Sequence, residues 1–201
     1  MAQYIGTTVI TSVVAGTNCS GGGTSGTVTV DVDDAFLVND ANDTTSGTIT
    51  AAGFTTTGIV DAAIRKFTPT GTTTDGTVTG GDVVYFGGTT SMTAGAIYHY
   101  KSDGTWELAD ADAASTCDGL LGVALGAASD TNGVLLRGFV TLDHDPGAIG
   151  DVLYVSTTAG DCSSTAPSGS GDVARVIGYQ VSHASNGNIW FNPSSTFTEL
   201  S

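Results

Sequence analysis

Short apolar runs separated by turn residues make up most of this chain. Val, Ile and Thr are frequent within the runs, and Gly or a cluster of Thr, Ser and Asp interrupts almost every stretch of ten residues. This pattern is typical of strands joined by turns, and it predicts an all-β fold. The predicted strands are 8–14, 27–32, 36–38, 47–51, 76–79, 83–86, 96–101, 105–109, 120–125, 134–140, 152–156, 173–182 and 188–191.

One segment departs from this pattern. Residues 57–67 carry apolar side chains at helical spacing, and two basic residues fall in what would be the last turn, where cations suit the helix dipole. Thr57 is a suitable N-cap, and Pro69 would end the helix. The apolar positions are Ile59, Ala63, Ile64 and Phe67. The sequence therefore predicts one short helix at 57–67.

A Thr- and Gly-rich stretch at 68–81 separates two regions of different character. We expect a Thr/Gly-rich β region with the short helix at 1–75, and a compact β-barrel or β-sandwich domain at 76–201. Apolar residues that alternate or cluster between turn signals predict the core of the second domain. They are Leu121, Val123, Leu125, Leu136, Phe139, Leu153, Val155, Val176 and Ile177.

An aromatic hairpin can be placed from the sequence. Two strands flank Ser102-Asp103-Gly104, the composition of a tight turn in which Gly supplies a positive φ. Tyr98, Tyr100 and Trp106 would then lie together. Their rings are candidates for stacking on a glycan, but ordinary cross-strand packing is the simpler interpretation.

The net charge of the chain limits the kinds of molecule that it can bind. Twenty Asp and Glu residues against five Lys and Arg residues give a formal charge of −15. Because the sequence offers no basic face to neutralise phosphates, we expect that the protein does not bind nucleic acid. An acidic surface is repelled by anionic lipid, and the apolar runs are far shorter than a membrane span. With 40% hydrophobic residues the chain is also too apolar to be disordered, so we expect a soluble globular protein.

The cysteines give no sign of a disulfide framework. Cys19, Cys117 and Cys162 form no CxxC pair, and an odd number cannot all pair within one chain. We expect free thiols. The first residues show no basic or strongly apolar region of a secretory signal, so we expect synthesis in a reducing cytoplasm.

No motif favours catalysis or cofactor binding. Residues 21–26 match GxGxxG, but 27–32 read as a strand where a dinucleotide site needs a helix. The histidines at His99, His144 and His183 lie in different hairpins and lack the spacing of a zinc site. We therefore expect no enzyme, no catalytic or metal-binding residues and no cofactor.

Two weaker signals are kept open. In Asp143-His144-Asp145 a carboxylate could orient the imidazole while its other nitrogen acts, although a surface turn is the plainer interpretation. Carboxylates also cluster at 31–34 and 39–43, and Ca²⁺ takes six to eight oxygen ligands of this kind. Solvated loops are the simpler interpretation there.

The order of segments after about residue 80 resembles virion proteins of tailed bacteriophages, particularly small β-rich capsid decoration (cement) proteins. The motifs that carry the resemblance are GDVVY at 81–85, ADAA at 111–114, GLLGVAL at 119–125, GVLLRGFV at 133–140, GDVLYVS at 150–156 and RVIGY at 175–179. NIWFNPS at 188–194 resembles the C-terminal ends of phage tail-fibre proteins. The resemblance implies no catalytic residue.

These observations lead to a hypothesis of function and two alternatives. The resemblance implies a non-enzymatic capsid decoration protein on the outer face of a phage head, a homotrimer bound to the major capsid protein. We expect residues 1–75 to supply contacts to the shell or to a neighbour, because they hold too few large apolar residues for a core of their own. The alternatives are a tail-fibre or head-fibre subunit that binds a host receptor, and a self-assembling surface-layer or filament protein.

Overall fold

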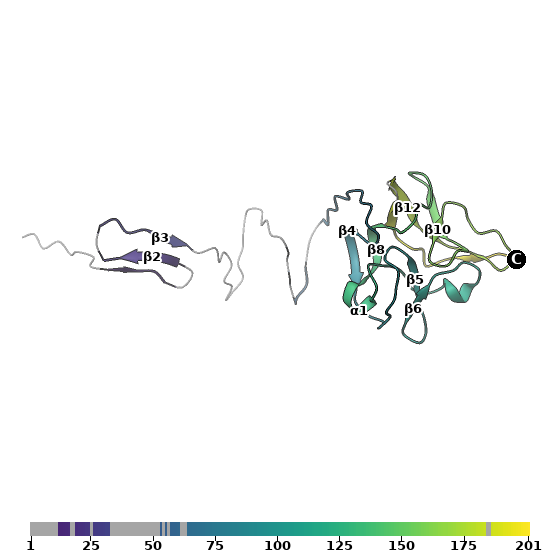
Figure 1. Cartoon of the computed structure of the whole chain (residues 1–201), viewed down its shortest axis with the longest axis horizontal. Coiled ribbons are helices and arrows are strands. Elements are labelled where there is room, and N and C mark those ends of the chain that lie inside the picture. Colours follow the sequence, from purple (N-terminus) through teal and green to yellow (C-terminus); the bar gives the residue numbers. More distant parts are fainter. Residues whose placement is uncertain are drawn as a thin grey trace, which may run out of the picture. The chain divides into compact units, whose positions relative to one another are not determined.

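The computed structural model describes residues 12–16, 19–24, 26–32, 53, 55, 57–60, 64–183 and 186–201. The chain forms two units, Met1–Asp61 and Ala62–Ser201 (Figure 1). The boundary expected near residue 75 falls within the second unit. Thr72 explains why, since its backbone N–H donates to Asn188 Oδ1 at 3.0 Å and its hydroxyl lies 2.6 Å from that of Thr141.

The described part of the first unit is a three-stranded antiparallel sheet in the order β1-β2-β3. Its strands are β1 (Val13–Val14), β2 (Cys19–Gly23) and β3 (Val30–Val32). Gly21 and Gly22 have positive φ, and a Cβ at Gly21 would meet the carbonyl oxygen of Thr29 at 2.3 Å, so this close approach needs glycine. The strands predicted at 36–38 and 47–51 lie outside the described residues.

The second unit is built on a nine-stranded antiparallel sheet that curls into a half-barrel. The strand order is β10-β9-β12-β13-β8-β7-β5-β6, and β4 pairs with β8, while β11 and β14 form a separate pair. The bounds are β4 (Val78–Val84), β5 (Ile97–Tyr100), β6 (Trp106–Leu108), β7 (Leu121–Ala124), β8 (Val134–Thr141), β9 (Val152–Val155), β10 (Cys162–Ser163), β11 (Val173–Ala174), β12 (Val176–His183), β13 (Gly187–Phe191) and β14 (Thr198–Glu199). The all-β prediction is confirmed.

Strand β8 organises this sheet. It pairs with β4 along almost its whole length, with β7 near its start and with β13 near its end. A Cβ at Gly138 would lie 2.2 Å from the carbonyl oxygen of Gly80, and one at Gly81 would lie 2.3 Å from that of Arg137. The glycines therefore allow β4 and β8 to cross closely where their register shifts.

Main-chain hydrogen bonds outside the strand ladders bridge the curled sheet. Ile97 N–H donates to Gly160 O at 2.8 Å, and Gly160 N–H donates to Ala109 O at 2.7 Å. Ala111 N–H donates to Ser156 O at 2.9 Å. The segment around β5 and β6 is thereby joined to the end of β9 and the turn that precedes β10.

Five of the nine predicted core residues are buried, and the other four, Leu125, Leu136, Phe139 and Val176, are only partly buried. Buried as expected are Leu121, Val123, Leu153, Val155 and Ile177.

Leu136 and Phe139 are only partly buried, and Leu135 and Val140 lie in the main core instead. Because Leu135 and Val140 lie five positions apart, strict alternation cannot place both inside. The register irregularities between β4 and β8 break the alternation between them.

The helix expected at 57–67 does not form in the described part of that segment, since 57–60 and 64–67 are irregular. Ile59 and Ile64 are 96% and 84% exposed, so no apolar face is buried to stabilise a helix this short. Among the described residues, helical structure occurs instead as the single turn α1 (Ser129–Asn132) and the 3₁₀ turn η1 (Ala114–Thr116).

Candidate functional site

His144 is the centre of the first polar cluster. Its Nδ1 lies 2.8 Å from Asp143 Oδ1 and 3.5 Å from Asp161 Oδ1, so a carboxylate of the triplet does orient the imidazole, which the sequence had left open beside a surface turn. Burial opposes a charged ring, but the hydrogen bond to Asp143 and the charges of Asp161 and Asp143 outweigh it and raise the pKa of His144. Asp145, the other carboxylate of the triplet, lies near Gln180, whose Nε2 is 3.4 Å from its Oδ1.

The second ring nitrogen decides what this cluster can do. The backbone N–H of Cys162 donates to His144 Nε2 at 3.0 Å, so in the neutral ring Nε2 carries the lone pair and Nδ1 carries the proton. The ligand atoms of Asp143, His144 and Asp161 lie within 4.8 Å of one another, a spacing that suits a metal ion. The protonated Nδ1 offers that ion no lone pair, and Nε2 is not free to act as a base. The geometry favours a structural role, in which His144 connects Asp143 to the backbone of Cys162 through hydrogen bonds.

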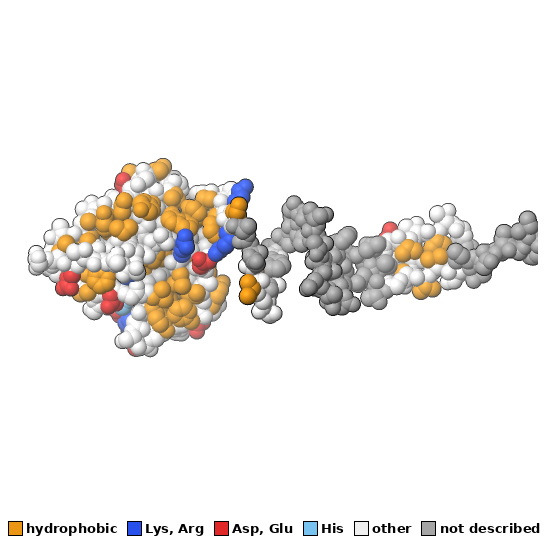
Figure 2. All heavy atoms as spheres, turned by 180° about the vertical axis from the view of Figure 1, so that it is seen from behind, with side chains coloured by type: hydrophobic (Ala, Val, Ile, Leu, Met, Phe, Trp, Pro, Cys, Tyr) orange, Lys and Arg blue, Asp and Glu red, His pale blue; other side chains and the backbone are white. Residues whose placement is uncertain are grey.

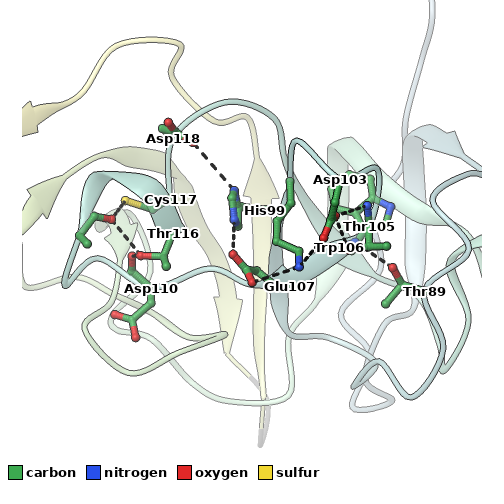
Figure 3. Close-up of polar contacts among 12 residues, drawn as sticks. Thr89, His99, Asp103, Thr105, Trp106, Glu107, Asp110, Thr116, Cys117 and Asp118 are labelled. Carbon is green, nitrogen blue, oxygen red and sulfur yellow. Dashed lines mark hydrogen bonds and ion pairs between the residues drawn. The ribbon is translucent and has the colours of Figure 1, made fainter.

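His99 is the centre of a second cluster (Figure 3). Its side chain is 4% exposed and lies between two carboxylates, with Nε2 2.7 Å from Glu107 Oε1 and Nδ1 3.9 Å from Asp118 Oδ1. Nδ1 has no hydrogen-bond partner among the described residues. Lys101 extends the cluster, because its Nζ lies 3.6 Å from Glu107 and 3.0 Å from Asp103. Burial of the imidazole keeps a substrate away from it.

The turn of the β5–β6 hairpin is held by Asp103. Its Oδ1 accepts from the backbone N–H of Thr105 at 3.0 Å and from the Thr105 hydroxyl at 2.7 Å (Figure 3). The bond from the Thr105 hydroxyl, helped by Lys101, lowers the pKa of Asp103 from its usual 3.8 to about 2. Strand pairing of Tyr100 with Trp106 confirms the predicted hairpin.

The hairpin aromatics form a second core cluster. Tyr98 and Trp106 are 5% and 3% exposed, and Tyr100 lies 4.9 Å from the rings of both Phe86 and Trp106. Trp106 Nε1 donates to the carbonyl of Phe86 at 2.9 Å. A glycan could not stack on rings that are buried in this way, so cross-strand packing is the correct interpretation of Tyr98 and Trp106.

The described thiols are buried and free. Cys117 and Cys162 form no disulfide, which agrees with the expectation for these two residues, and the side chain of Cys19 is outside the described part of the chain. Burial raises the pKa of Cys117 to about 11 and also raises that of Cys162. Neither thiol is poised as a nucleophile at neutral pH.

Arg175 is a structural residue that the sequence analysis did not single out. It is buried, and its guanidinium donates to the carbonyl oxygens of Ser194 at 2.9 Å, Cys117 at 2.5 Å and Gly119 at 2.8 Å. Burial lowers its pKa. The signal was present, since an arginine inside the apolar run at 173–181 must find partners for its donors when the strand is buried.

The GxGxxG match and the acidic clusters can be compared with the structure only in part. Gly21, Gly22 and Gly23 of the GxGxxG match belong to β2, and the chain continues into β3, so no helix follows to face a pyrophosphate. In the acidic clusters, Asp31 lies in β3, and residues 33, 34 and 39–43 are outside the described part of the chain.

Comparisons with protein-family models, curated proteins and solved structures found no match. Within the described ranges, no helix has the length and apolar character needed to cross a bilayer.

Proposed function

We propose that this chain is a non-catalytic structural protein of a virion, a decoration protein that binds the assembled shell of a phage head through contacts with the major capsid protein. The observation that carries the proposal is the exposure of the first unit: it forms strands, yet none of its residues whose burial is described is buried. Val14 is 84% exposed and Val30 is 45% exposed.

A small sheet without a buried face is marginally stable by itself in water. Packing its apolar side chains against another chain stabilises it by about 25 cal/mol for each Å² of apolar surface removed from water. The first unit is therefore suited to dock on a partner, and a shell that repeats the same surface many times would offer such a partner at every site.

The second unit supports a structural role in a different way. His144 accepts from a backbone amide, His99 is buried between two carboxylates, and Arg175 donates to three carbonyl groups. These groups stabilise the half-barrel rather than facing a substrate. The high negative charge would keep a particle coated with this protein soluble.

Copy number tests the proposal most directly. A decoration protein should be present in purified virions in numbers comparable with the major capsid protein, and its deletion should lower the temperature at which heads lose DNA. Tens of copies or fewer, together with loss of adsorption to the host, would refute decoration and favour a receptor-binding fibre subunit. Native mass spectrometry of the free protein would test the homotrimer.

A matched pair of variants tests the docking role of the first unit. Val14→Asp places a charge on the exposed side chain of β1, and Ile149→Asp makes the same change at a 62% exposed apolar residue of the second unit. We expect Val14→Asp to reduce binding to empty heads at least tenfold and Ile149→Asp to change it less than twofold. Equal losses, or no loss for Val14→Asp, would contradict the assignment.

A further inference from the structure

A cavity of about 250 Å³ opens on the surface of the sheet beside β4, β8 and β13. It lies on the second unit alone and combines two guanidinium groups, one carboxylate and two aromatic rings. Its lining residues are Arg65, Phe67, Gly81, Asp82, Arg137 and Trp190.

Strand register brings the polar and aromatic groups of the cavity together. Asp82 of β4 lies opposite Arg137 of β8, and Trp190 of β13 lies opposite Phe139 of β8. Directly opposite residues share one face of a sheet, so all four side chains project from β4, β8 and β13 toward the same region. The rings of Phe139 and Trp190 are 4.7 Å apart.

Phe67 completes the aromatic side of the cavity from the segment before β4. A Cβ at Gly80 would meet Phe67 Cδ1 at 2.3 Å, so the ring lies directly on the glycine backbone. It also packs edge-on against Phe139, with ring centroids 6.3 Å apart. Glycine at position 80 therefore creates the space that the ring occupies.

The two guanidinium groups of the cavity differ in their partners. Arg65 pairs with Asp82 at 3.0 Å and lies 5.2 Å from the centroid of the Phe67 ring. Arg137 lies 5.5 Å from the centroid of the Trp190 ring, and within the described part of the chain its guanidinium has no hydrogen bond or ion pair. Figure 2 shows one face of the second unit, on which several Lys and Arg side chains lie near one another beside an acidic one. An exposed arginine without a carboxylate is notable in a chain of charge −15.

We propose that this cavity binds an acidic sugar of monosaccharide size, such as a uronic acid. The Arg137 guanidinium has the paired donors that match a carboxylate, and its stacking on Trp190 orients them. Asp82 accepts hydrogen bonds from sugar hydroxyls. The C–H groups of the sugar contact the parts of Phe67 and Trp190 that line the cavity beside the two guanidinium groups.

The composition of the cavity argues against other ligands. A neutral sugar leaves the Arg137 guanidinium without an anionic partner, and an aromatic carboxylate has no hydroxyl to donate to Asp82. A polyanion such as nucleic acid meets the repulsion of the whole acidic surface. The volume is below the 300 to 1,000 Å³ that is usual for drug-sized ligands and suits a single ring.

The test uses the full chain and the two tryptophan indole N–H signals in a ¹H–¹⁵N NMR spectrum. Trp190 lines the cavity, and Trp106 lies in the second core cluster as an internal reference. Titration with sodium glucuronate is expected to shift the Trp190 signal saturably in the millimolar range while the Trp106 signal stays in place. Glucose and benzoate are the controls, and each is expected to bind at least tenfold more weakly.

Three variants separate recognition from folding. Arg137→Gln is expected to weaken glucuronate binding at least tenfold. Arg137→Lys keeps the charge without the paired donors and is expected to give an intermediate loss. Lys101→Gln removes a basic side chain that pairs with Asp103 and Glu107 outside the cavity, and is expected to change affinity less than twofold.

Well-dispersed spectra establish that each variant is folded. The absence of a saturable glucuronate shift, equal binding of glucose or benzoate, or unchanged affinity in a folded Arg137→Gln or Arg137→Lys variant would each overturn the proposal.

Discussion

Leu135 and Leu136 are adjacent and chemically identical, yet β8 places them in different environments. Leu135 is fully buried in the main core, whereas Leu136 is partly buried at the edge of the aromatic cluster. Leu135→Ala removes the packing of a buried side chain and leaves a cavity, which costs about 3 to 5 kcal/mol of the free energy of unfolding. For Leu136→Ala, part of the side chain is already in water, so we expect about 1 kcal/mol.

Urea unfolding followed by tryptophan fluorescence measures this difference, because both tryptophans, Trp106 and Trp190, lie in the second unit. With an m-value of about 2 kcal/mol/M, Leu135→Ala should lower the urea midpoint by about 1.5 to 2.5 M and Leu136→Ala by about 0.5 M. The m-value itself should stay constant. Equal losses, or a larger loss for Leu136→Ala, would refute the placement of Leu135 inside and the broken alternation of β8.

Three further predictions concern charged and reactive groups. Arg175→Met should lower the free energy of unfolding by about 3 kcal/mol in thermal unfolding, since it leaves the carbonyls of Ser194, Cys117 and Gly119 without their donor. A loss below about 0.5 kcal/mol would contradict the structural role of Arg175. Because its folded pKa is lowered to about 2, Asp103 should stabilise the hairpin above pH 4 and lose that contribution as the pH falls through 2. Carboxyl NMR of Asp103 tests this, and a midpoint near 4 would be inconsistent with its bonds to Thr105. Cys117 should resist alkylation in the native protein at pH 7 and react after unfolding, whereas rapid native labelling would contradict its burial and its pKa of about 11.

The sequence predicted best those elements whose determinants lie close together in the chain. The β5–β6 hairpin follows from a turn at Ser102-Asp103-Gly104 between two aromatic strands, and each determinant lies within a few residues of the others. The all-β class likewise follows from frequent glycines between short apolar runs. Such information is local, and it needs no knowledge of how distant strands pair.

The prediction of the helix at 57–67 was wrong for the described part of that segment because spacing alone does not stabilise a helix. Ile59 and Ile64 remain exposed, so no burial offsets the cost of ordering the backbone there. Phe67, counted as part of the helix face, instead lies on Gly80 of β4. Tertiary packing determined its position.

Neither the cavity beside β4, β8 and β13 nor the hydrogen bonding of His144 could have been predicted from the sequence. Asp82, Arg137 and Trp190 come from three strands that are distant in the chain, and a register change of one residue would turn each side chain to the opposite face. The hydrogen bond to His144 Nε2 is donated by the backbone N–H of Cys162, and no sequence motif encodes such a bond. Sequence spacing could suggest that Asp143 orients the imidazole, but it could not show that the other nitrogen is occupied.

The main-chain bonds at Gly160 have a consequence for how the half-barrel moves. Main-chain hydrogen bonds outside the strand ladders connect Gly160 with Ile97 and Ala109 across the curled sheet. Strand β8, by contrast, is paired with neighbouring strands along both of its edges. A fluctuation that separates the Gly160 turn from β5 therefore leaves the β4–β8–β13 ladders intact and admits water to the interior from one side. In hydrogen exchange, the amides of Ile97 and Gly160 should lose their protons by this local breathing motion, and those of β8 only when the whole domain unfolds.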